Sequence, residues 1–241
     1  MGGSTWGLGI EALDDAALLW LHQFMFRWPL LDRFGGWLLD SYLVKFGPLT
    51  AAVCWLWFRA GSALDAVRTR LLDALTAGLG GLVLGRALAL WLPFRERPLS
   101  RPELHFTIPF GFDMRTWSAF PSDHAVMAFA LALSLLRISR PLGVWACLHA
   151  ALVVCLPRVY FGLHHPSDVV AGVLLAAVLA FLVPRLPVCQ AANRALLRAE
   201  RNHAGAFYAA GFLLLYQITE MFASLRVVAI GAFRVLRHVA G

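Results

Sequence analysis

The chain contains few charged residues and almost no lysine. Only 15% of its 241 residues are charged, and Lys45 is the single lysine, so arginine supplies nearly all of the positive charge. Hydrophobic residues make up 60% of the sequence, and the mean hydropathy is +0.69. This composition excludes an ordinary soluble domain and favours a membrane protein.

Cysteines are too few and too scattered to form a zinc site or a redox pair. Cys54, Cys147 and Cys155 fall in apolar segments, and Cys189 falls in a connection. No two of them have the close spacing of a metal or redox motif, so we expect them to serve in packing.

The positive charge lies between the apolar segments. The chain has 21 basic and 14 acidic residues, which gives a formal charge of +7. In a soluble protein this excess would favour nucleic-acid binding. Arginines that flank apolar segments instead fit topology signals and contacts with anionic lipids. We therefore expect a lipid bilayer as partner and no nucleic acid; the sequence does not indicate an oligomeric state.

The apolar segments predict an all-α, polytopic transmembrane helix bundle that forms one domain over residues 1–241. A chain of this length accommodates about six spans of roughly 20 residues each. The expected spans are residues 37–58, 71–92, 123–136, 141–157, 168–184 and 205–219. A break at residues 32–36 is expected before the first of them.

The two ends of the chain are less apolar than its middle. Residues 8–26 have apolar positions at helical spacing, interrupted by Glu11, Asp14, Asp15 and His22. This pattern is typical of an amphipathic helix in the membrane interface, with a span as the alternative. The extension 185–241 contains a sixth span or a partly amphipathic helix over residues 205–219.

The arginines also predict the topology. The connections 59–70, 137–140 and 185–201 are rich in arginine, and all three share one face if the spans alternate. Such connections are typically cytoplasmic. The loop 93–122 and the turn 158–166 then lie together on the opposite face.

Polar clusters stand at the ends of apolar segments on that opposite face, and ionisable groups beside a membrane indicate a functional site. Ser122 is a natural N-cap, and the helix start that follows presents free N–H groups to an anion. His124, in the first turn, is placed to protonate a leaving oxygen. A capped helix with a surface histidine is the simpler alternative.

The second cluster places His164 four residues before Asp168. We expect Asp168 to accept a hydrogen bond from one ring nitrogen and to leave the other nitrogen free as a nucleophile. The alternatives are a boundary histidine with a capping aspartate, or a metal site. No third ligand stands at matching spacing, so we expect no metal and no cofactor. Arg97 and Arg158 offer planar donor forks for phosphate, although either alone would also suit a headgroup anchor.

Together, Arg97-Pro98, Pro121-Ser122-Asp123-His124 and Arg158-x5-His164-x3-Asp168 resemble the three-part signature of the type-2 phosphatidic acid phosphatase superfamily. That superfamily contains integral lipid phosphatases, glucose-6-phosphatases and vanadium haloperoxidases. The resemblance covers roughly residues 70–184, and its third part is the most specific.

The resemblance implies a role for each of these residues. It implies that His164 attacks phosphorus to form a phosphohistidine, that Asp168 orients His164, and that His124 protonates the leaving oxygen. It further implies that Arg97, Arg158 and Ser122 hold the phosphate, and that no metal takes part.

Three positions depart from the family pattern. Leu90 stands where the first motif usually opens with lysine. Arg95 and Arg86 are the two candidates to supply the missing charge, and we expect Arg95, which lies on the loop side in an extended segment before Pro98. The alternative is that Arg95 only marks the membrane boundary. Pro157 replaces a serine. Asp123 replaces a glycine, as in the undecaprenyl pyrophosphate phosphatases of the superfamily.

We therefore expect a metal-independent phosphatase that acts on a polyprenyl (undecaprenyl) pyrophosphate or phosphate. Its active site is expected to face the periplasm from a bacterial inner membrane. The alternatives are a phosphatase or phosphotransferase for glycerolipid or lipid A phosphates and, from a different class, a transporter or scaffold that binds lipid phosphates without hydrolysing them.

Overall fold

The structure is a computed structural model that describes residues 8–59, 64–104, 106 and 117–228. Every regular element in these ranges is helical, which confirms the all-α prediction. Loop 93–122 is the segment expected to cover the headgroup of the substrate, and its residues 105 and 107–116 lie outside the described residues.

The elements follow one another along the chain without a repeat. They are α1 (Leu8–His22), α2 (Pro29–Asp40), α3 (Tyr42–Phe58), α4 (Leu64–Trp91), the 3-10 turns η1 (Pro98–Ser100) and η2 (Pro102–Leu104), α5 (Asp123–Leu136), α6 (Arg140–His149), the π-helical turn η3 (Ala150–Cys155), α7 (Leu156–Tyr160), α8 (Pro166–Leu182), the 3-10 turn η4 (Val183–Arg185), α9 (Pro187–Asn202) and α10 (Ala204–Thr219).

Helix α5 is the centre of the bundle, with α4, α6 and α8 packed around it. Its side chains from Ala125 to Leu135 are almost all buried, because neighbouring helices cover every face. Glycines allow the close approach. A Cβ atom at Gly172 of α8 would lie 2.8 Å from the carbonyl oxygen of Ser122, at the start of α5. The packing of α8 therefore fixes the position of this helix start.

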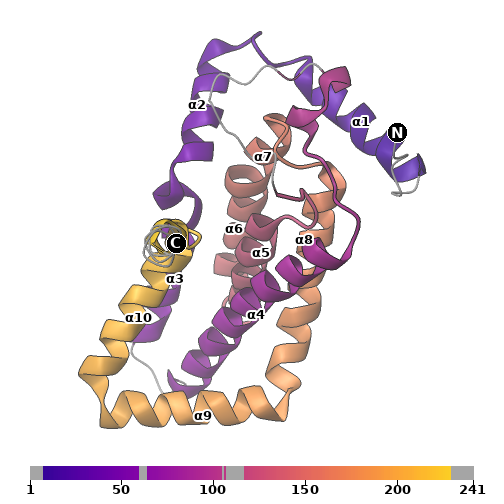
Figure 1. The fold of residues 1–241 in the computed structure, drawn as a ribbon. Coiled ribbons are helices and arrows are strands. Elements are labelled where there is room, and N and C mark those ends of the chain that lie inside the picture. Colours follow the sequence, from indigo (N-terminus) through magenta and orange to yellow (C-terminus); the bar gives the residue numbers. More distant parts are fainter. Residues whose placement is uncertain (1–7, 60–63, 105, 107–116, 229–241) are drawn as a thin grey trace, which may run out of the picture.

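The remaining helices frame this bundle. In Figure 1, α1 lies across one end, α9 crosses the opposite end, and α10 runs beside α3. A helix, α1, stands where the amphipathic helix was expected over residues 8–26, and it ends at His22; its place in the membrane interface stays a prediction.

The break expected at residues 32–36 is wrong, because α2 runs through them and the chain bends at Ser41 instead. Pro29 occupies the first turn of α2, where a missing N–H costs nothing. The Ser41 side chain accepts a hydrogen bond of 3.3 Å from the backbone N–H of Val44 and so caps α3. The two glycines at positions 35 and 36 therefore serve packing rather than chain reversal.

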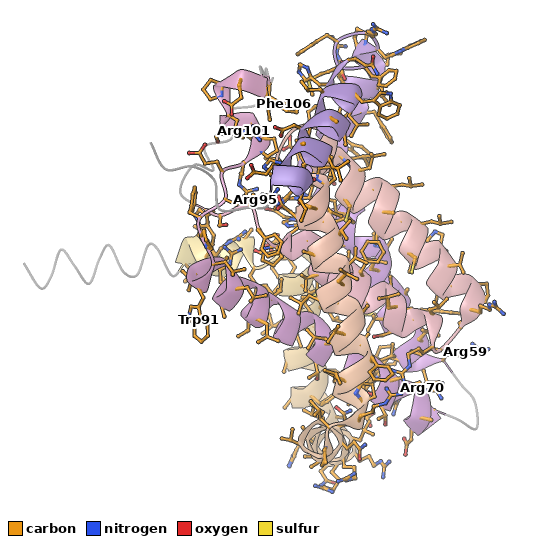
Figure 2. The ribbon with its side chains drawn as sticks, turned by 90° about the vertical axis from the view of Figure 1, so that its right-hand side faces the viewer. Arg59, Arg70, Trp91, Arg95, Arg101 and Phe106 are labelled. Atoms are coloured by element: carbon orange, nitrogen blue, oxygen red, sulfur yellow. The ribbon has the colours of Figure 1, made fainter. Side chains whose placement is uncertain are left out.

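The three arginine-rich connections lie together at the end crossed by α9. Arg68 of α4 forms an ion pair of 3.1 Å with Glu200 of α9. Arg70 donates a hydrogen bond of 3.2 Å to the carbonyl oxygen of Arg137, in the α5–α6 turn. Figure 2 shows Arg59 and Arg70 at this end and Arg95, Arg101 and Phe106 at the other.

Apolar helices stand at all six positions where spans were expected, although the segment 37–58 is divided at Ser41 between α2 and α3. Among the described residues, three of the helical segments are long and apolar enough to cross a membrane, namely Leu64–Trp91, Arg140–Tyr160 and Pro166–Arg185. Three shorter apolar helices accompany them, namely Tyr42–Phe58, Asp123–Leu136 and Ala204–Thr219.

The contact between α4 and α5 yields a stability prediction. A Cβ at Gly81 would clash with a methyl group of Val126, whereas a Cβ at the neighbouring Gly80 meets nothing within 4 Å. Gly81→Ala should lower the free energy of unfolding by about 1–3 kcal/mol through overpacking. Gly80→Ala should be neutral or slightly stabilising, since alanine favours a helix. Thermal unfolding in detergent measures both variants; equal midpoints would contradict this packing.

Candidate active site

Three connections meet at the end of the bundle near α1. The backbone N–H of Ala119, before α5, donates to the carbonyl oxygen of Arg95, after α4, at 2.9 Å. The N–H of Ser122 donates to the carbonyl oxygen of Asp168, in α8, at 3.1 Å. These two bonds join the polar clusters that the sequence analysis expected to converge.

His164 is held in one tautomer. Its Nδ1 atom lies 2.8 Å from the carbonyl oxygen of Ala119 and 3.7 Å from Asp168. Because a carbonyl oxygen only accepts, Nδ1 carries the proton and Nε2 keeps its lone pair. Burial lowers the pKa of His164 to about 4, against the opposing effect of Asp168 and together with the nearby charges of Arg97 and Arg158. The ring is therefore neutral at neutral pH.

Asp168 ties the site together but is not the nearest acceptor of His164. One carboxylate oxygen accepts the backbone N–H of His165 at 2.8 Å, and the other accepts the Arg95 guanidinium. The sequence analysis expected a hydrogen bond from His164 to Asp168, and the structure places the carbonyl of Ala119 nearer. Asp168 therefore faces the ring as a negative charge.

Arg97 and Arg158 bring unpaired donors into the site. Nη1 of Arg97 donates to the carbonyl oxygen of Leu163 at 2.7 Å, but its Nε has no acceptor. Within the described residues nothing accepts a hydrogen bond from the Arg158 guanidinium, although this side chain is buried. The Ser122 hydroxyl is also buried without a partner. Buried donors without acceptors are rare, and an anion would satisfy them.

His124 begins α5 beside these arginines. It is half-buried, and its ring lies 5.7 Å from the ring of Phe46 in α3. His164 and Arg158 lie within electrostatic reach of it. The three expected catalytic side chains, His124, His164 and Asp168, are thus gathered at one site.

Arg95 is buried and paired with carboxylates. It forms an ion pair of 2.6 Å with Asp14 of α1, a second ion pair with Asp168, and a hydrogen bond of 2.7 Å with the hydroxyl of Ser167. Asp14 also accepts the backbone N–H of Ser167 at 2.9 Å. Arg95 therefore connects α1 to α8, and a direct contact with phosphate stays a prediction.

Asp14 is a site residue that the sequence analysis missed. It was treated as a polar interruption of an amphipathic helix, yet it is buried at the start of α8. The adjacent Asp15 binds Arg101 through two hydrogen bonds of 2.7 and 2.9 Å. Two adjacent carboxylates on an otherwise apolar helix were the available signal for a docking contact.

The carboxylate of Asp123, which would repel a bound phosphate, is neutralised within the protein. Arg86 of α4 forms an ion pair with it. The same guanidinium lies over the ring of Trp117, with 4.7 Å between its central carbon and the ring centroid. The charge of Arg86 therefore balances that of Asp123.

The second histidine of the pair has a different environment from the first. The Nε2 atom of His165 lies 3.1 Å from the backbone carbonyl oxygen of Glu96. Burial lowers the pKa of His165 as well. Across the described ranges, no three His, Cys, Asp or Glu side chains gather closely enough to hold a metal ion.

The arrangement has the parts of an in-line displacement on phosphorus. A neutral imidazole with a defined lone pair stands beside buried cationic donors, and a second histidine lies nearby. Donors of this kind stabilise negative charge as it develops on phosphoryl oxygens.

Comparison with known proteins identifies the family of this chain. The PAP2 superfamily profile matches residues 71–190. The chain is 27% identical over 162 residues to an undecaprenyl-diphosphatase of Bacillus subtilis, covering 67% of this chain and 78% of the relative. It is 31% identical over 154 residues to a decaprenylphosphoryl-5-phosphoribose phosphatase of Mycobacterium tuberculosis, covering 64% and 82%.

A solved structure shares the fold. The transmembrane PAP2-type phosphatidylglycerolphosphate phosphatase of Bacillus subtilis superposes with a TM-score of 0.50 at 20% identity, over 73% of this chain and 85% of the other. The profile match, the relatives and the apolar helices lead to one assignment: this chain belongs to the PAP2 superfamily and is a membrane phosphatase.

Proposed function

We propose that this chain is a metal-independent phosphatase for a polyprenyl diphosphate or phosphate, such as undecaprenyl pyrophosphate. The observation that carries the proposal is His164, whose protonated Nδ1 leaves Nε2 free beside the unpaired donors of Arg97 and Arg158. Relatives named for undecaprenyl diphosphate and decaprenylphosphoryl phosphoribose support a polyprenyl substrate.

The reaction proceeds in two displacements. Nε2 of His164 forms a bond to phosphorus while the bond to the leaving oxygen breaks, and His124 gives that oxygen a proton. A water molecule then attacks the phosphohistidine, His124 takes a proton from the water, and the nitrogen–phosphorus bond breaks to release inorganic phosphate.

The surrounding residues stabilise these steps. Arg97, Arg158 and the Ser122 hydroxyl bind the phosphoryl oxygens, because their buried donors lack protein acceptors. Asp168 stabilises the positive charge that His164 gains on phosphorylation, at a distance of 3.7 Å from Nδ1.

The site faces the periplasm of a bacterial inner membrane in this proposal. The arginine-bearing connections gather at the opposite end of the bundle, as Arg59 and Arg70 in Figure 2 illustrate. An excess of arginine marks the cytoplasmic ends of membrane helices. A polyprenyl chain would then extend into the bilayer while its phosphates enter from the outer face.

A phosphate-release assay on the purified protein in detergent tests this function. Polyprenyl diphosphate, polyprenyl phosphate, phosphatidic acid, phosphatidylglycerolphosphate and lipid A phosphates are offered in parallel, each with and without chelator. We expect the polyprenyl substrates to be preferred and chelator to change little, while vanadate inhibits as an analogue of the five-coordinate transition state. Preference for a glycerolipid or lipid A phosphate, no release at all, or loss with chelator and recovery with magnesium would contradict the proposal.

Arg95 generates a second prediction about activity. Replacing it removes the charge that balances Asp168, and any contact that it makes with phosphate. Arg95→Ala should therefore lower kcat by roughly 30- to 1000-fold, the equivalent of about 2–4 kcal/mol in the transition state.

Arg101→Ala is the matched control, because Arg101 pairs with Asp15 of the same helix α1 but not with Asp168. It should leave kcat within a few-fold of wild type. Unfolding midpoints of both variants show whether the protein remains folded. If kcat stays within a few-fold of wild type in both variants, the prediction is wrong and Arg95 only holds α1 in place.

A further inference from the structure

The single lysine of the chain is buried close to the active site. Lys45 lies in the first turn of α3, and only 2% of its surface is exposed. Its ammonium donates a hydrogen bond to the carbonyl oxygen of Leu39 and lies 4.2 Å from the centre of the Tyr42 ring. Lys45 lies outside the three motifs that predicted the site residues.

The first turn of α3 adjoins the start of α5. Phe46, which follows Lys45, packs its ring 5.7 Å from that of His124. Lys45 itself lies within electrostatic reach of His124 and of Arg158. Lys45 therefore belongs to the same site although its helix is distant in sequence from the three motifs.

No carboxylate balances this buried charge in the described part of the chain. Lys45 forms no ion pair there, and the nearby Asp40 is exposed. An ammonium has three donors, and one carbonyl oxygen occupies only one of them. Burying a cation without a counter-charge is costly. Lys45 and Arg158 are thus two buried cations without an ion-pair partner among the described residues.

The first turn of α3 approaches the site at His124, the residue that protonates the leaving oxygen in the proposed reaction, because the ring of Phe46 packs 5.7 Å from that of His124. The electrostatic influence of Lys45 on His124 agrees with this placement on the leaving-group side. A cation at this position would contact the leaving group of the substrate and not the phosphoryl group that is attacked.

We propose that Lys45 binds the phosphate that remains on the lipid and thereby selects diphosphates over monophosphates. This inference rests on the proposed function. When His164 attacks the terminal phosphorus, the bridging bond breaks and its electron pair stays on the oxygen of the lipid-linked phosphate. Lys45 stabilises this anion, whereas a monophosphate leaves as an uncharged alcohol and gains nothing from Lys45.

Lys45 does not replace the lysine that the family pattern places at position 90. Leu90 is 78% exposed on α4, whereas the site residues of the motifs are mostly buried. A cation that enters from α3 reaches the site from another direction, next to His124. Lys45 therefore adds a contact on the leaving-group side.

The test compares farnesyl diphosphate with farnesyl phosphate, which differ only in the leaving group. In wild type and Lys45→Met, kcat/KM is measured for both substrates. Loss of one charged hydrogen bond should lower the diphosphate value by about 10- to 150-fold, and the monophosphate value by no more than about threefold. Lys45→Arg should restore part of the preference. Arg68→Met, which removes a half-buried cation at the opposite end, should leave the ratio of the two values unchanged.

Each outcome decides a separate question. An equal fall on both substrates would show that Lys45 only holds the α2–α3 turn through Leu39, and would overturn the inference. An unchanged ratio with normal activity would overturn it as well, while leaving the proposed function intact. Failure of the wild type to release phosphate from either substrate would reject the proposed function, and this inference with it.

Discussion

The carboxylate of Asp168 is the contact on which the rest of the active site depends. It accepts the guanidinium of Arg95 and the backbone N–H of His165, and it faces the ring of His164. Through Arg95 it is linked to Asp14, so that α1 is docked onto the start of α8. One buried negative charge thus connects His164, the proposed nucleophile, with two motif loops and the N-terminal helix.

Positive charge nevertheless exceeds negative charge around this carboxylate. Arg95 forms ion pairs with Asp168 and Asp14, and Arg86 forms an ion pair with Asp123. Three further cations, Arg97, Arg158 and Lys45, form no ion pair with a carboxylate among the described residues. Burial makes that surplus costly, and a phosphate anion relieves it. In the proposed function, these unpaired donors at the end of apolar helices bind the phosphate of a substrate that reaches the site from a membrane.

Much of this could be predicted from the sequence, because the motifs are local. The spacing from Arg158 to Asp168 fixes a loop and one helical turn, and long apolar runs fix the spans. The expected break at residues 32–36 was wrong because tertiary packing kept two glycines inside α2. Asp14 was missed because its partners, Arg95 and Ser167, lie far away in sequence, and no periodicity within α1 reveals them. Lys45 was missed because the approach of α3 to the start of α5, seen in the contact of Phe46 with His124, is a tertiary contact.

The central claim is that His164 becomes phosphorylated during turnover. Rapid acid-free quenching with a substrate labelled in its terminal phosphate, followed by peptide mapping, tests it directly. Wild type and His165→Ala should both carry an alkali-stable, acid-labile phosphate on the peptide that contains His164. His164→Ala should carry none and should lose kcat by roughly a thousandfold or more. Label on His165, or normal turnover by His164→Ala, would contradict the account.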